Sequence, residues 1–220
     1  MYINKTQIKG AIFDLDGTLL DSMAVWHDVD VQFFSRRNIE MPDDYQEKIK
    51  NMHFPSAAEY TKARFSLPDS IQSIIDEWRS LCFEAYQNHI RLKDGAYEFL
   101  QALHENGVKI AYATASEEQL CNAVLTSNNV IELFSAKAYV EEAGKSKAHP
   151  DVYWLASERL GLKPSECMVF EDILQGVRGA KKGGFTVCGV YDSCSRSEAE
   201  EIKHVSDLYI TSFRELLCSR

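Results

Sequence analysis

The sequence predicts an α/β fold, a Rossmann-like parallel sheet with helices on both faces, interrupted by an inserted all-helical domain. From residue 92 onward, short apolar runs alternate with amphipathic helical patterns, which is typical of a parallel sheet. An apolar strand at residues 11–13 precedes this alternation. The segment between them shows helical periodicity without a convincing strand. We therefore expect an α/β core of residues 1–20 and 92–220 and an inserted helical domain of residues 21–91.

Four helices are predicted in the inserted segment. Apolar residues recur at helical spacing along residues 23–37, 55–65 and 70–88, and residues 43–52 form a more polar helix. In the core we expect helices at 95–106, 117–127, 150–160, 174–182 and 212–218, and strands at 108–113, 136–140, 167–170, 185–190 and 208–210. Ser116 is the expected N-cap of the helix at 117–127.

Composition limits the possible functions. The chain has 220 residues and a formal net charge of -9, which argues against a general nucleic-acid or anionic-membrane binder. It has no signal-peptide core and no apolar run of membrane-spanning length. Its six cysteines contain no C-x-x-C pair, so we expect reduced thiols. A cytoplasmic monomer that acts on a small molecule fits these features.

Two carboxylates follow the first predicted strand. Asp14 and Asp16 lie where ligands bind in an open α/β sheet, at the carboxyl end of the strands. Acids this close repel one another unless a cation lies between them or one is protonated. Gly17 allows backbone N–H groups to approach an anion, and Thr18 adds a hydroxyl. A phosphate site with Mg²⁺ is the favoured interpretation, and an acidic turn is the alternative for Asp-x-Asp-Gly taken alone.

Further polar groups follow three other predicted strands: Thr114, the lysines of Gly-Lys-Ser-Lys (Lys145 and Lys147), and the pair Glu171 and Asp172. Each has a simpler interpretation alone, as a cap, a solvated lysine or a carboxylate at a helix start. Their common position at strand ends favours one site. Together these groups suit metal-assisted phosphoryl transfer.

The string Asp-Leu-Asp-Gly-Thr-Leu-Leu-Asp-Ser, residues 14–22, resembles the first motif of the haloacid dehalogenase (HAD) superfamily. Thr114, Lys147 and the segment Phe-Glu-Asp-Ile (170–173) resemble its later motifs, in order. With its glycines at 176 and 179, the chain is similar to the branch that contains phosphoglycolate phosphatases and β-phosphoglucomutases. Its helical insertion, residues 21–91, resembles the cap domain of that branch.

This resemblance implies roles for individual residues. Asp14 would be the nucleophile that forms an aspartyl-phosphate, and Asp16 the general acid and base. Mg²⁺ would be held by Asp14, the Asp16 carbonyl, Asp172 and, directly or through water, Glu171. The phosphoryl group would be bound by Gly17, Thr114, Ala115 and Lys147.

Departures from the sequence pattern of this branch help to distinguish a phosphatase from a phosphomutase. Trp26 stands where the mutases of this branch carry a histidine, with His27 one residue later. The segment around His53 and Phe54 offers no match for the arginine with which those mutases hold a second phosphate. We therefore expect a phosphatase of small phosphate monoesters, with a sugar phosphomutase as the alternative. A non-catalytic metabolite-binding module is the alternative from another class, and Asp16 argues against dehalogenase chemistry.

Overall fold

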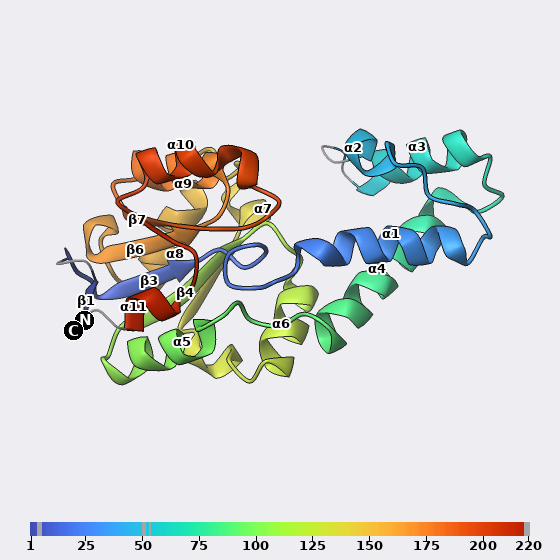
Figure 1. Ribbon diagram of the computed structural model, residues 1–220. Coiled ribbons are helices and arrows are strands. Elements are labelled where there is room, and N and C mark those ends of the chain that lie inside the picture. Colours follow the sequence, from blue (N-terminus) through green and yellow to red (C-terminus); the bar gives the residue numbers. More distant parts are fainter. Residues whose placement is uncertain (4–5, 50–51, 53, 218–220) are drawn as a thin grey trace. The chain divides into compact units, whose positions relative to one another are not determined.

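The structure is a computed structural model that describes residues 1–3, 6–49, 52 and 54–217 (Figure 1). Contacts divide the chain into two compact units. The α/β unit consists of Met1–Ser22 and Ile90–Arg220, and the helical unit consists of Met23–His89. No helix within the described residues has the length and apolar composition needed to cross a bilayer.

The α/β unit is built on a six-stranded parallel sheet with strand order β5-β4-β3-β6-β7-β8. The strands are β3 (Gly10–Phe13), β4 (Lys109–Thr114), β5 (Ala136–Tyr139), β6 (Cys167–Glu171), β7 (Thr186–Val190) and β8 (Leu208–Ile210). The chain extends the sheet from β3 through β4 to β5, then returns to the other side of β3 with β6. The strand order therefore reverses between β3 and β6, which is where open α/β sheets bind ligands. The predicted fold class is confirmed.

The central strands β3, β4 and β6 are buried almost throughout, since most of their residues are apolar. Ile12 and Val169 belong to a core cluster that includes residues of the helices α8 (Asp151–Leu160) and α9 (Leu174–Lys182). Phe13 and Phe170 are neighbours in register, and successive residues of a strand face opposite sides. Their rings stack with centroids 4.5 Å apart, and such a pair contributes about 1 kcal/mol beyond area burial.

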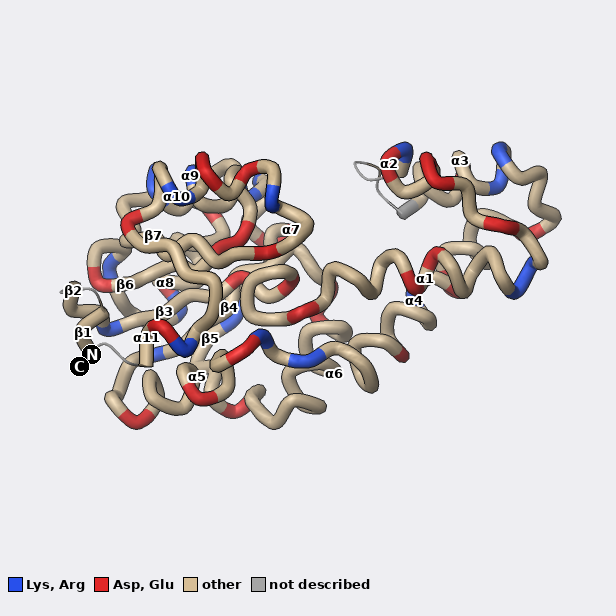
Figure 2. The backbone as a smooth tube through the Cα atoms, viewed as in Figure 1, with Lys and Arg blue, Asp and Glu red and all other residues tan. Residues whose placement is uncertain are grey.

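Helices cover both faces of this sheet. In Figure 1, α9 and α10 lie on one side of it and α5 and α6 on the other. The remaining elements are α5 (Ala96–Glu105), α6 (Glu118–Ser127), α7 (Val140–Ala143), α10 (Ala199–Val205), α11 (Arg214–Leu217), the antiparallel pair β1 (Tyr2–Ile3) and β2 (Thr6–Gln7), and 3₁₀ helices at Ile131–Leu133, Pro164–Glu166 and Arg196–Glu198. The sequence did not predict β1, β2, α7 or α10, because they are too short to show a hydrophobic period. Acidic and basic residues are spread along the helices and loops (Figure 2).

The helical unit comprises α1 (Met23–Ser35), α2 (Tyr45–Ile49), α3 (Phe54–Phe65) and α4 (Ile71–Asn88). Its core is aromatic: Phe34 meets Tyr45 edge to face at 4.7 Å, and Phe33 packs on Trp78 at 5.4 Å. Ser70 caps α4, since its hydroxyl accepts a hydrogen bond from the Ser73 N–H at 3.0 Å. The second helix begins two residues later than predicted because residues 43–44 form a turn.

Asp30 on α1 makes the stability of the helical unit depend on pH. Burial raises the pKa of Asp30 to about 6, against the opposing effects of a 3.1 Å hydrogen bond from Gln46 Nε2 and of His27. The folded state therefore favours the protonated carboxyl of Asp30. The protonated carboxyl contributes fully to the free energy of unfolding below pH 3.8, and this contribution is lost as the pH rises through about 6. Asp30→Asn keeps an acceptor for Gln46 without a charge. We expect it to be about 2 to 3 kcal/mol more stable than wild type at pH 8 and to lose this advantage near pH 4.

Urea unfolding followed by tryptophan fluorescence at both pH values tests this, because Trp26 and Trp78 lie in the helical unit. Asp28→Asn is the control, since Asp28 is exposed on the same helix. A difference between Asp30→Asn and wild type that is the same at pH 4 and pH 8 would contradict the assignment.

Candidate active site

Three of the predicted site residues lie at the carboxyl ends of three adjacent strands. Asp14 directly follows β3, Thr114 is the last residue of β4, and Glu171 is the last residue of β6. The Asp14 N–H donates to the Phe170 carbonyl at 3.0 Å, which extends the β3–β6 pairing up to the site. The switch point of the sheet therefore brings together residues from distant parts of the sequence.

Lys147 joins two of these strand ends. Its ammonium forms ion pairs with the carboxylate of Asp14 and, at 2.7 Å, with Oε1 of Glu171. The Lys147 side chain is 6% exposed, that of Asp14 is 8% exposed and that of Glu171 is completely buried. Burial lowers the pKa of Lys147, but Asp14 and Glu171 outweigh it and raise that pKa above its ordinary value. Lys145, the other lysine of the motif, is exposed and pairs with Asp151 at 3.0 Å.

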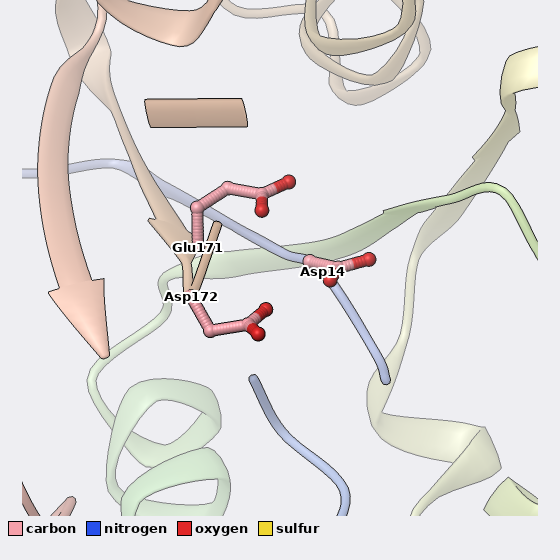
Figure 3. A group of neighbouring side chains, drawn as sticks. All are labelled: Asp14, Glu171 and Asp172. Carbon is pink, nitrogen blue, oxygen red and sulfur yellow. The ribbon is translucent and has the colours of Figure 1, made fainter. Parts of the chain in front are cut away.

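Asp14, Glu171 and Asp172 form a cluster of buried carboxylates with ligand oxygens within 4.8 Å of one another (Figure 3). Burial, reinforced by the neighbouring carboxylates, raises the pKa of Asp172 to about 8. Burial also raises the pKa of Glu171 to about 7, against the opposing charge of Lys147, and raises the pKa of Asp14. One ammonium does not balance three carboxylates, so the cluster needs protons or a further cation near neutral pH.

The donor set fits a divalent cation. Carboxylate oxygens are the ligands of hard ions such as Mg²⁺. Glu171 Oε2 is buried without a hydrogen-bond partner in the described part of the chain. Such an orphaned acceptor is costly unless a water or an ion satisfies it. The three side chains can therefore hold a metal ion.

Gly17 and Thr18 hold the loop after β3 against Asp172. The Thr18 hydroxyl donates to Asp172 Oδ1 at 2.7 Å. Gly17 has a φ of +79°, and a Cβ at this position would lie 2.5 Å from Asp172 Oδ2. The turn therefore requires glycine both for its left-handed backbone and for its close approach to the carboxylate.

Asp16 is bound by hydroxyls from two separate segments. Ser22 Oγ donates to its Oδ1 at 2.7 Å, and Ser116 Oγ donates to its Oδ2 at 2.5 Å. The expectation that Ser116 caps α6 is therefore wrong: Glu117 occupies the N-cap position, and the Ser116 hydroxyl is committed to Asp16. A local capping pattern cannot show a partner that lies 100 residues away.

The loop after β4 supplies Thr114 and Ala115. Thr114 is buried, and its Oγ1 accepts a hydrogen bond from the Ser116 N–H at 3.0 Å. Ala115 is exposed at the start of the loop. Of the candidate substrate residues in the helical unit, Trp26 is half-buried on α1 and Phe54 is the first residue of α3, while His53 lies outside the described residues.

Tyr153 is a site residue that the sequence does not predict. This α8 residue is fully buried, and its hydroxyl donates to Glu171 Oε1 at 2.7 Å. Burial and the neighbouring Glu171 raise the pKa of Tyr153 well above its ordinary value, so the phenol stays a donor. Its spacing within the apolar stripe of residues 150–160 was the only local signal, and that signal indicates a core residue.

Comparison with known proteins decides the family. The model of the haloacid dehalogenase-like hydrolases matches residues 8–184, which include every candidate site residue. The chain belongs to this family. It is therefore an enzyme, and the predicted superfamily is confirmed.

Named relatives of this HAD-like hydrolase are phosphatases. It is 29% identical over 182 residues to hexitol phosphatase B of Escherichia coli strain K12, with 80% of each chain covered. It is 25% identical over 195 residues to validoxylamine A 7′-phosphate phosphatase of Streptomyces hygroscopicus subsp. limoneus, covering 87% of this chain and 91% of that one. The structure of CbbY from Rhodobacter sphaeroides in complex with phosphate has the same fold, with a TM-score of 0.77, 23% identity and 96% of both chains covered.

Proposed function

We propose that this HAD-like hydrolase is a Mg²⁺-dependent phosphatase that hydrolyses small phosphate monoesters through an aspartyl-phosphate on Asp14. The observation that carries the proposal is the buried Asp14 carboxylate, which is paired with Lys147 at the switch point of the sheet. A carboxylate in this position can attack phosphorus, while the adjacent ammonium neutralises phosphoryl charge. Gly17, Thr114 and Ala115 would provide further phosphoryl contacts from the neighbouring loops.

The proposed reaction has two displacements at phosphorus. Asp14 attacks phosphorus, the ester P–O bond breaks, and Asp16 gives a proton to the leaving oxygen. Asp16 then takes a proton from water as that water attacks phosphorus, and the bond from phosphorus to Asp14 breaks. Because Ser22 and Ser116 occupy both oxygens of Asp16 in this structure, Asp16 must exchange one hydroxyl for the leaving group.

The side chains of Asp14, Glu171 and Asp172, with the carbonyl of Asp16, would hold Mg²⁺. Bound there, the ion would neutralise charge on the transferring phosphoryl group. Thr18 would keep Asp172 oriented through its 2.7 Å hydrogen bond.

Two features support hydrolysis rather than sugar phosphate isomerisation. The helical unit, as a cap, would supply specificity residues such as Trp26, His53 and Phe54, and none of these matches the mutase groups that hold a second phosphate. Two of the named relatives are a hexitol phosphatase and a validoxylamine A 7′-phosphate phosphatase. Hexitol phosphates are therefore the first substrates to test.

The experiment measures inorganic phosphate from a panel of phosphorylated metabolites, with Mg²⁺ and with EDTA. We expect release from at least one monoester, and no release in EDTA. A parallel reaction contains β-glucose 1-phosphate, Mg²⁺ and catalytic glucose 1,6-bisphosphate. Glucose 6-phosphate formed much faster than phosphate would overturn the proposal in favour of a phosphomutase. Binding of a metabolite with no turnover of any panel member would favour a non-catalytic module.

A further inference from the structure

Tyr153 connects helix α8 to the carboxylate cluster. Its hydroxyl and the ammonium of Lys147 both donate to the same oxygen, Glu171 Oε1, each at 2.7 Å. The other oxygen, Oε2, has no hydrogen-bond partner in the described part of the chain. Two donors on one oxygen fix the rotation of the carboxylate and leave Oε2 without a protein donor.

Gly176 completes the surroundings of this carboxylate. A Cβ on Gly176 would lie 2.5 Å from Glu171 Oε2 and 2.9 Å from Oε1, so the glycine makes room for both oxygens. Glu171 therefore lies between the backbone of α9 and the donors Lys147 and Tyr153. Its side chain is completely buried, and it reaches within 4.8 Å of the ligand oxygens of Asp14 and Asp172.

Lys147 alone would not fix this orientation. Without the tyrosine hydroxyl, the carboxylate could rotate about its Cγ–Cδ bond and share both oxygens with the ammonium. Because Lys147 also pairs with Asp14, such a rotation would change the ion pair next to the nucleophile. The phenol is a neutral donor, so it orients Glu171 without adding positive charge to a site that must attract a cation.

We propose that Tyr153 is a positioning residue that orients Glu171 for the divalent cation. The inference rests on the proposed function, because the cation belongs to that proposal. Groups that hold a metal ligand in place through a hydrogen bond typically contribute 10- to 100-fold to metal affinity or activity. The aromatic ring of Tyr153 makes a packing contact that does not involve the hydroxyl, because it meets the Phe185 ring edge to face at 6.2 Å.

The test compares wild type with Tyr153→Phe, which keeps the ring and removes the hydroxyl. Tyr112→Phe is the matched control, because Tyr112 is also buried in the α/β unit and its hydroxyl bonds the Tyr139 hydroxyl at 2.8 Å. Mg²⁺ is titrated in two assays: phosphate release from p-nitrophenyl phosphate, and the shift in melting temperature with Mg²⁺ alone. We expect the Mg²⁺ midpoint to rise about 10- to 100-fold for Tyr153→Phe in both assays and to stay unchanged for Tyr112→Phe.

Four outcomes are informative. A Tyr153→Phe midpoint within twofold of wild type in both assays would overturn the inference. Equal shifts for Tyr112→Phe, or a Tyr153→Phe chain that does not fold, would also overturn it, because the hydroxyl would then act through general stability. A wild-type chain that responds to Mg²⁺ in neither assay would instead overturn the proposed function, and the role of Tyr153 with it.

Discussion

Asp14→Asn is expected to reduce turnover by at least about 10³-fold while the chain stays folded. The amide has the shape of the carboxylate, but it cannot form the acyl-phosphate bond and is a poor metal ligand. Asp14 is one of three clustered buried carboxylates, of which Lys147 pairs with only Asp14 and Glu171, so removing the charge of Asp14 also relieves its repulsion from Glu171 and Asp172. The melting temperature should therefore equal or exceed that of wild type.

Phosphate release from p-nitrophenyl phosphate and thermal melting are measured in parallel. Acid-quenched wild type is examined by mass spectrometry for phosphate on residue 14. Asp43→Asn, a substitution of an exposed aspartate in the helical unit, is the control and should keep full turnover. Retention of more than a few per cent of activity by Asp14→Asn would exclude it as the nucleophile.

The sequence was sufficient to predict the sheet and the meeting of Asp14, Lys147 and Asp172. Apolar runs such as residues 11–13 identify strands because a parallel sheet is buried on both faces. Polar residues directly after such runs must lie at one edge of the sheet. The local pattern of apolar runs therefore predicts which residues, although far apart in the sequence, lie close together in the fold. Motif order then distinguished Lys147 from Lys145, which composition and spacing alone could not do.

The contacts among these residues were not predictable in the same way. Ser116 fits a capping pattern locally, but its hydroxyl bonds Asp16 across the site. Tyr153 has the spacing of a core residue and is one, yet its single polar atom binds Glu171. In both cases a hydroxyl donates a hydrogen bond to a residue outside its own helix or loop. Hydrophobic periodicity and helix propensity do not predict such a partner.

Gly179 is a further residue whose contacts the local sequence pattern does not show. Gly179 is buried in the middle of α9, where helix propensity alone predicts that Gly179→Ala stabilises the protein by about 1 kcal/mol. The structure predicts the opposite. A Cβ at this position would overlap the carbonyl oxygen of Lys147 and lie 3.1 Å from that of His149. Both obstacles are backbone atoms, so no side-chain rotation relieves the overlap.

We therefore expect Gly179→Ala to destabilise the chain by about 3 kcal/mol, at the upper end of overpacking effects. Moving the loop would also withdraw the Lys147 ammonium from Asp14 and Glu171, so turnover should fall along with stability. Urea unfolding and phosphate release from p-nitrophenyl phosphate measure the two effects. Gln175→Ala, an exposed substitution on the same helix, should change stability by less than about 0.5 kcal/mol. A Gly179→Ala chain that is more stable than wild type and fully active would mean that the loop holding Lys147 does not depend on close contact with α9.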